Sequence, residues 1–210
     1  MIEDNTNIDE LMNQISTKKP DLLEVRLDKL QSNTILKEIV ARKSFPVIAT
    51  DKSDRAPANV LEKLAYAAGV GFELVDLDIA TSNAEAIKRM KSKGAEVILS
   101  HHDYSKTPAQ DQLVKILESE KKLGCDICKI ITTAQQPQDN LIVLGFVQSE
   151  SPSVRLVSFA MGTHGTPSRV LSPWFGAEFT FAALSGQFKT AEGQPTIDEL
   201  RSAWQILGLD

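Results

Sequence analysis

Short apolar runs that end in polar residues recur along this chain of 210 residues. Such runs predict buried strands, because a strand covered on both faces is apolar almost throughout. The seven candidate strands lie at residues 21–28, 46–51, 72–79, 96–103, 125–134, 155–162 and 177–184. Between the runs, apolar residues return at the three- and four-residue spacing of an amphipathic helix, for example at Ile8, Leu11, Met12 and Ile15. Strand and helix are therefore expected to alternate.

The residues between these segments fit the expected helix ends. Gly94 and Gly124 follow helical patterns, where glycine commonly ends a helix. Thr107-Pro108 places a capping residue before proline, and Thr196 with Glu199 predicts a capping box that opens the last helix.

Alternating strands and helices indicate a parallel sheet covered by helices, either open or closed into a barrel. Ionisable residues inside or after several strands favour a barrel, because barrel enzymes assemble their active sites at the carboxyl ends of the strands. These residues are Glu24, Arg26, Asp28, His102 and Lys129. No G-x-G-x-x-G follows the first strand, and no P-loop occurs. We expect one (β/α)8 TIM-type barrel domain over residues 1–210.

Composition narrows the functional class. Hydrophobic residues make up 42% of the chain, charged residues make up 24%, and the formal net charge is -5. This balance is typical of a globular domain and lacks the basic face of a nucleic-acid binder, so a small-molecule substrate is expected. The amino-terminal residues are polar, and no apolar run approaches the length of a membrane span. We expect a cytoplasmic protein that does not bind a membrane.

The two cysteines, Cys125 and Cys128, form a C-x-x-C sequence that is compatible with a redox pair or half a metal site. Because they fall in an expected strand, three positions apart, their side chains should point to opposite faces. We interpret them as small core residues.

Lys129 interrupts the apolar sequence around it in the fifth candidate strand. Burial of a lysine lowers its pKa, and the neutral amine is the form that attacks a ketone. Alternatively, the aliphatic stem packs in the core and the ammonium reaches water at the end of the strand. From these residues, both interpretations remain open.

His101 and His102 end the preceding candidate strand, and only one of two neighbours on a strand can face the barrel interior. A histidine there is suited to general acid and base catalysis near neutral pH. It is equally compatible with a structural, hydrogen-bonded role.

Two further segments carry charges. Glu24, Arg26 and Asp28 alternate along the first candidate strand, so they should share one face and either bind a ligand or form a structural ion-pair network. The segment 165–169 either turns into a helix or presents Arg169 and backbone N–H groups to an anion.

Six ordered motifs across nearly the whole chain resemble type I 3-dehydroquinate dehydratase, the Schiff-base lyase of the shikimate pathway of aromatic amino acid biosynthesis. The motifs are EVRLD at 24–28, SHHDYSKTP at 100–108, DICKI at 126–130, MGTHGTPSR at 161–169, WFGAEFTFA at 174–182 and AEGQPTIDELR at 191–201. The resemblance implies the TIM barrel fold, no cofactor or metal, and a homodimer.

The resemblance also implies roles for individual residues. Lys129 matches the Schiff-base lysine, and the motif pattern selects His102 rather than His101 for proton transfer. The implied substrate-binding residues are Glu24 and Arg26 for the hydroxyl groups, Lys52 on the loop after the second strand, Arg169 for the carboxylate, Phe181 for the ring, and Thr190 and Gln194 on a closing loop.

The chain departs from the family pattern at three places. Lys52 replaces an arginine, and Ala56 stands where a glutamate that assists the histidine would align, so we hypothesise that Asp54 supplies that carboxylate. Glu192 replaces a proline on the closing loop, where its charge is expected to weaken the binding of an anionic substrate. The family begins with a strand before its first helix, whereas a helix pattern begins here almost at once, so one strand is expected to be short or missing unless the start site is misplaced.

Two alternatives remain. One is a class I aldolase, another Schiff-base barrel, acting on a small keto acid or sugar. The other is a degenerate barrel that binds a metabolite without catalysis.

Overall fold

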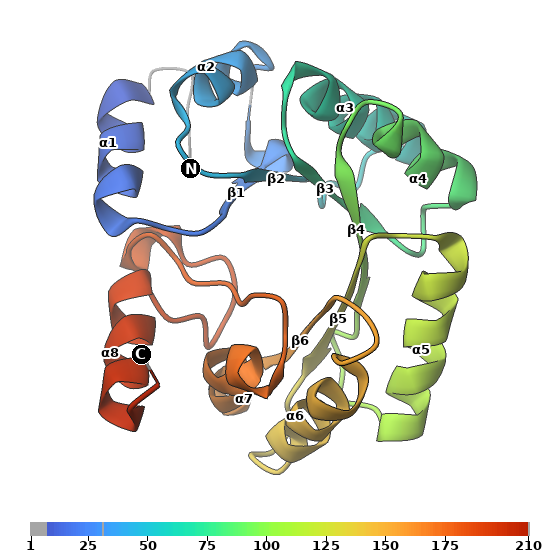
Figure 1. Ribbon diagram of the computed structural model, residues 1–210, viewed down its shortest axis with the longest axis vertical. Coiled ribbons are helices and arrows are strands. Elements are labelled where there is room, and N and C mark those ends of the chain that lie inside the picture. Colours follow the sequence, from blue (N-terminus) through green and yellow to red (C-terminus); the bar gives the residue numbers. More distant parts are fainter. Residues whose placement is uncertain (1–7, 31, 210) are drawn as a thin grey trace. The chain divides into compact units, whose positions relative to one another are not determined.

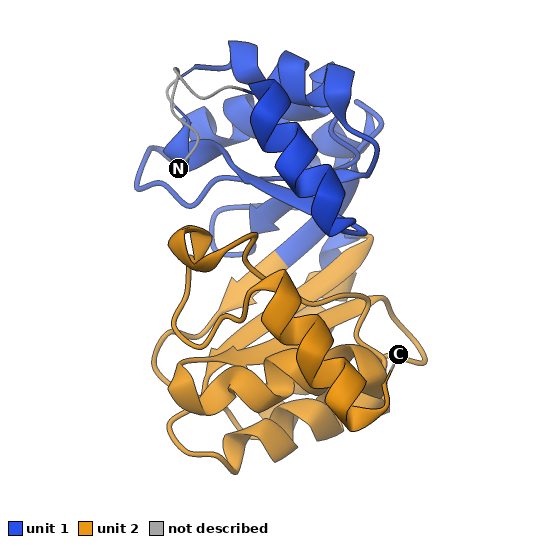
Figure 2. Ribbon diagram, turned by 90° about the vertical axis from the view of Figure 1, so that its left-hand side faces the viewer, with its two compact units in different colours: residues 1–99, 123–125 blue, residues 100–122, 126–210 orange. Residues whose placement is uncertain are grey.

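A computed structural model describes residues 8–30 and 32–209 of the chain. It divides into two compact units, one comprising residues 1–99 and 123–125 and the other residues 100–122 and 126–210 (Figure 2). The expectation of a single barrel domain stays a prediction.

The first unit alternates helix and strand (Figure 1). Its elements are α1 Ile8–Lys18, β1 Leu23–Arg26, α2 Thr34–Arg42, β2 Val47–Thr50, α3 Pro57–Val70, β3 Leu74–Asp78 and α4 Ala84–Lys91, with a short 3₁₀ helix, η1, at Leu27–Lys29 after β1. Strands β1 and β2 pair in parallel, and so do β2 and β3. All four residues of β2 are buried, as expected of a strand that is covered on both faces.

The second unit continues the alternation. After β4 Glu96–His102, whose last residues belong to this unit, come α5 Gln110–Leu123, β5 Ile127–Thr133, α6 Asp139–Glu150, β6 Leu156–Met161, η2 Thr163–Gly165, α7 Thr166–Leu171, η3 Ser172–Phe175, η4 Gly186–Phe188 and α8 Ile197–Leu207. Strands β5 and β6 are parallel, and Lys129 lies opposite Val157. The order of the strands in the sheet is the order of the chain, from β1 to β6.

The helices bury the apolar faces that the sequence pattern predicts. In α1, the residues Ile8, Leu11, Met12 and Ile15 are buried, which confirms the predicted periodicity. Thr196 and Glu199 form the predicted capping box of α8. Gly94 and Gly124 follow α4 and α5 with positive φ angles, 88° and 84°. That conformation favours glycine, because it has no Cβ.

The seventh candidate strand, 177–184, is not a regular strand, so this prediction is wrong. The backbone N–H of Glu178 donates to Leu156 at one end, and Ala183 forms an isolated bridge with Thr196 at the other. Between them the Thr180 hydroxyl donates to the carbonyl of Arg169. The segment is tied to three separate places and forms no continuous ladder. The expected missing first strand would fall in residues 1–7, outside the described residues.

The cysteines are free thiols; Cys128 is buried in β5, and Cys125 is half-buried. The strand begins at Ile127, so the argument from alternating faces does not apply to Cys125. Within 8–30 and 32–209, no group of three or more His, Cys, Asp or Glu residues is arranged to hold a metal ion. None of the helices described there is long and apolar enough to cross a membrane.

Candidate active site

The predicted site residues are divided between the two units. Glu24, Arg26 and Lys52 lie in the first unit, and the second holds His102, Lys129, Arg169, Phe181, Thr190 and Gln194. The roles of these residues in binding and catalysis stay predictions.

Lys129 lies in the middle of β5, with only 5% of its surface exposed. Its Nζ is 4.5 Å from the centroid of the Phe181 ring. Its backbone N–H donates to the carboxylate of Glu120, a fully buried residue of α5, at 3.1 Å. This burial favours the enclosed amine over the alternative in which the ammonium reaches water at the strand end. The amine of Lys129 is therefore enclosed beside an aromatic ring in the middle of the strand.

Arg169 is almost fully buried in α7, and its guanidinium carbon lies 4.1 Å from the centroid of the Phe159 ring. Phe159 in turn meets Phe181 edge to face, with centroids 6.2 Å apart. Burial lowers the pKa of Arg169 to about 10, so it is still a cation at neutral pH. Its Nε has no hydrogen-bond acceptor among the residues that the structure describes. A buried cation of this kind is suited to bind a carboxylate.

A close approach between β6 and the start of α7 fixes the position of Arg169. Ser168 accepts the backbone N–H of Ala160 through its hydroxyl oxygen, at 2.9 Å, and donates its own N–H to Asn140 of α6. A Cβ on Gly165 would lie 2.5 Å from the carbonyl oxygen of Ala160, so glycine is required there. The turn thus enters a helix and fixes the position of the arginine, and binding of an anion there stays a prediction.

His102 ends β4 and stacks on Tyr104, with ring centroids 5.8 Å apart and an interplanar angle of 13°. The turn after it is fixed by Asp103, whose backbone N–H donates to Ile131 of β5 and whose carboxylate accepts hydrogen bonds from Ser105 and Lys106. Burial acts to raise the pKa of Asp103, but these hydrogen bonds and the charge of Lys106 outweigh it and hold the pKa below its ordinary value.

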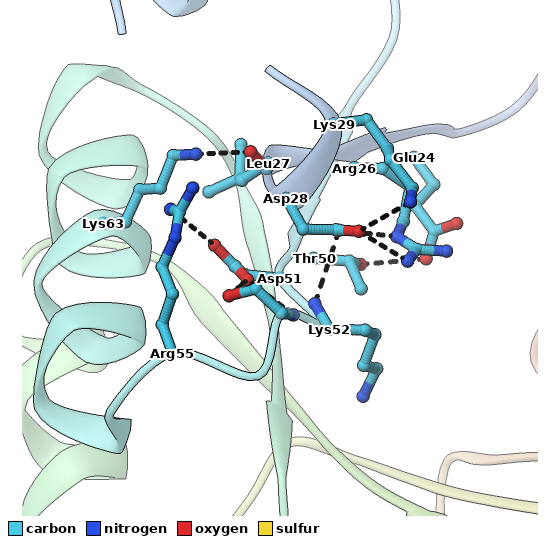
Figure 3. Close-up of polar contacts among 11 residues, drawn as sticks. Glu24, Arg26, Leu27, Asp28, Lys29, Thr50, Asp51, Lys52, Arg55 and Lys63 are labelled. Carbon is cyan, nitrogen blue, oxygen red and sulfur yellow. Dashed lines mark hydrogen bonds and ion pairs between the residues drawn. The ribbon is translucent and has the colours of Figure 1, made fainter. Parts of the chain in front are cut away.

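The first unit carries a network of paired charges (Figure 3). Arg26 donates two hydrogen bonds of 2.8 Å to the two carboxylate oxygens of Asp28. Asp28 lies in η1, beyond the end of β1, so the prediction that it shares a strand face with Glu24 and Arg26 is wrong. Burial acts to raise the pKa of Asp28, but the hydrogen bond and charge of Arg26 lower it below its ordinary value.

Glu24 and Lys52 each have a polar partner of their own in the first unit. The carboxylate of Glu24 accepts a hydrogen bond of 2.8 Å from the Thr50 hydroxyl. The ammonium of Lys52 lies 3.1 Å from a carboxylate oxygen of Asp76 and 3.7 Å from one of Asp78, both on β3. Sequence reasoning missed these two aspartates, although each interrupts an apolar strand pattern as Lys129 does.

The loop after β2 places Asp54 and Ala56 at the surface, where both side chains are exposed. The hypothesis that Asp54 replaces the family's glutamate stays a prediction, which the activity of Asp54→Ala would test. Asp51 is buried instead, and its carboxylate accepts hydrogen bonds from the backbone and hydroxyl of Ser53. Asp51 therefore holds Ser53 within this loop.

On the predicted closing loop, Gln194 is buried, and its side-chain oxygen accepts hydrogen bonds from the backbone and hydroxyl of Thr190, at 2.8 and 3.1 Å. The structure therefore brings together Lys129 with Phe181, and Thr190 with Gln194.

The chain is similar to known proteins over its whole length. The profile of the family described as Type I 3-dehydroquinase matches residues 1–210. A 3-dehydroquinate dehydratase from Dehalococcoides mccartyi is 32% identical over 182 residues, which cover 84% of this chain and 82% of that protein. One from Pyrococcus abyssi is 30% identical over 210 residues, covering 96% and 94%.

Solved structures agree on the fold. A 3-dehydroquinate dehydratase from Geobacillus kaustophilus superposes with a TM-score of 0.84 at 24% identity, covering 95% of this chain and 85% of that one. A type I enzyme from Clostridium difficile gives 0.84 at 22% identity, covering 95% and 86%. The fold is the TIM-type β/α fold of these enzymes, with six regular strands in the described part of the chain where a complete barrel has eight. The chain belongs to the type I 3-dehydroquinase family.

Proposed function

We propose that this protein is a 3-dehydroquinate dehydratase, a hydro-lyase that converts 3-dehydroquinate to 3-dehydroshikimate through a Schiff base on Lys129. The observation that carries the proposal is the buried amine of Lys129 against Phe181, in a chain that belongs to this family. A lysine amine is the group that forms a Schiff base with a ketone.

The reaction starts with attack of the neutral Lys129 amine on the ketone carbon. Loss of the carbonyl oxygen as water gives a protonated imine, which accepts electrons more readily than the ketone. His102 takes a proton from the carbon next to the imine, and the electron pair of that C–H bond forms an enamine. The enamine expels the hydroxyl group on the adjacent carbon, which leaves as water with the proton from His102. Hydrolysis of the imine then releases the product and regenerates Lys129.

The other predicted residues hold the substrate during these steps. Arg169 pairs with the substrate carboxylate, which compensates the buried guanidinium. The Phe181 ring packs on the substrate ring and on the lysine. Glu24, Arg26 and Lys52 bind hydroxyl groups, and Thr190 and Gln194 contact the substrate from the closing loop. No step requires a metal or an organic cofactor.

The test is intact mass spectrometry after incubation with 3-dehydroquinate and borohydride, combined with absorbance of the conjugated product. Wild type is expected to gain the mass of a reduced adduct and to form product. Lys129→Ala should lose the adduct and at least about a thousandfold of the rate, because removal of a nucleophile disables the whole catalytic unit. Lys115→Ala, at an exposed lysine of α5, is the matched control and should resemble wild type.

Two other outcomes would contradict the proposal. An adduct without product would support the non-catalytic barrel, and cleavage of a carbon–carbon bond in a keto acid would support the aldolase. We further propose a cytoplasmic homodimer, by analogy with the family. Size-exclusion chromatography with light scattering tests the dimer, since a monomeric mass would contradict it.

A further inference from the structure

The predicted closing loop, residues 184–195, leaves and returns to the body of its unit at one point. The backbone N–H of Ala183 donates to Pro195 at 2.8 Å, and that of Ile197 donates to Ala183 at 2.9 Å. These bonds close the base of the loop. They do not fix the direction in which the rest of the loop points, so other contacts must determine it.

The loop is fastened near its end to the segment that follows β6. The carboxylate of Glu192 accepts a hydrogen bond of 2.6 Å from the hydroxyl of Thr163, in η2. The hydroxyl of Thr166 donates to the carbonyl of Gly193 at 3.1 Å. A charged acceptor makes the first of these the stronger bond.

Gly193 allows this close contact. Its φ of 74° is in the left-handed region, and a Cβ there would overlap the carbonyl oxygen of Gly162. The loop backbone therefore lies directly on the turn that leads into η2 and α7. An alanine at 193 would force the two segments apart.

Glu192 has a structural contact that the sequence does not suggest, and its expected effect on the binding of an anionic substrate stays a prediction. Its carboxylate is engaged by Thr163, and the neighbouring residues Thr190 and Gln194 are bonded to each other. The same loop thus carries a fastening residue and the two residues predicted to contact the substrate.

We propose that Glu192 is a positioning residue, which through its hydrogen bond to Thr163 holds loop 184–195 closed before the substrate binds and so places Thr190 and Gln194. The kinetic part of this inference rests on the proposed function. The structural part concerns the ligand-free protein and is tested separately.

The structural test is the rate of trypsin cleavage after Lys189, an exposed lysine within the loop, measured by mass spectrometry without substrate. Thr163→Val and Glu192→Ala should each raise the rate about threefold to fivefold, the effect of one exposed charge-assisted hydrogen bond. Glu192→Gln should stay close to wild type, because an amide oxygen also accepts the hydroxyl. Gly193→Ala should exceed all three.

Thr17→Val and Glu85→Ala are the matched controls, since both residues are exposed and lie in the other unit. Their cleavage rates should equal that of wild type. Wild-type rates in Thr163→Val and Glu192→Ala, or a Glu192→Gln rate as high as that of Glu192→Ala, would overturn the proposal.

The kinetic test compares the same variants in the dehydratase assay. Thr163→Val and Glu192→Ala should raise KM about threefold to fivefold and leave kcat within about twofold, because the loop contributes to binding the substrate and its transition state alike. Glu192→Gln should restore KM. An unchanged KM in Glu192→Ala would overturn the positioning role. If wild type itself lacks dehydratase activity, the proposed function fails, and the cleavage assay still decides whether the loop is fastened.

Discussion

The two units hold their cations in different ways. In the first unit, Arg26 and Lys52 are paired with carboxylates that come from the same unit, Asp28 and Asp76. In the second, Lys129 and Arg169 are buried against the rings of Phe181 and Phe159. A carboxylate partner fixes the position of a cation, whereas a cation on an aromatic face has no bound counter-charge in that contact. The comparison shows that the cations of the first unit have carboxylate partners, whereas those of the second unit lie on aromatic rings.

Among the tests of this comparison, Arg169→Met should have the largest effect on activity. Loss of the buried guanidinium should lower kcat/KM about a hundredfold, mainly through KM, because a desolvated pair with a substrate carboxylate is lost. The free energy of unfolding should fall by no more than about 1 kcal/mol, since removal of a buried charge offsets the lost packing. Steady-state kinetics and urea denaturation measure the two quantities. A strongly destabilised variant with an unchanged KM would show that Arg169 is structural.

An intermediate effect is expected from Asp76→Asn, which removes the charge that holds Lys52 in the first unit. The ammonium should then sample several positions, and kcat/KM should fall about tenfold, as expected from loss of one buried charged partner. Glu62→Gln, at an exposed ion pair with Arg89, is the control and should change nothing. Equal kcat/KM values for Asp76→Asn and wild type would contradict an orienting role of the Lys52–Asp76 pair.

The smallest expected effect concerns the pH dependence of stability. The pKa of Asp28 in the fold lies below its ordinary value of 3.8, so the paired carboxylate stabilises the fold above that pH. This contribution is lost as the pH falls through the lower pKa of the folded state. It should be below about 1 kcal/mol after allowance for solvent screening.

Urea denaturation between neutral and strongly acidic pH measures this contribution. Asp28→Asn should lose less stability on acidification than wild type, whereas Asp54→Asn, at an exposed carboxylate, should follow the wild-type curve. Parallel curves for Asp28→Asn and wild type would contradict the pairing in the first unit.

Much of the fold follows from the spacing of apolar residues. Six of the seven candidate strands are present, because each is a short apolar run between helices that bury one face. The seventh fails because side chains and loops, rather than a neighbouring strand, satisfy its backbone. The prediction that Thr107 caps a helix shows another limit. The Thr107 hydroxyl bonds to Thr132 and Thr133 of β5, and α5 begins only at Gln110. Such long-range partners cannot be identified from local spacing.

The candidate site was predictable to a similar degree. Lys129 is visible as a cation in a strand that should be buried, and the motifs identify Arg169 and His102. Two partners were not found: Asp76, which binds the Lys52 ammonium, and Glu120, which accepts the backbone N–H of Lys129. Each meets its partner only when separate segments pack together. Glu120 shares the face of α5 that carries Leu113 and Leu117, and a carboxylate on an apolar helix face is the signal that could have found it.

The close approach of Gly165 to Ala160 limits how the surroundings of Arg169 can be altered. Because no side chain fits at 165, and Ser168 is bonded to both β6 and α6, substitutions at these two positions would displace Arg169 before they altered its surroundings. Thr163, His164 and Pro167 in the same turn are exposed. A mutant library that seeks new acid substrates should therefore keep 165 and 168 constant and vary 164 and 167, while variation at 163 would also release the loop.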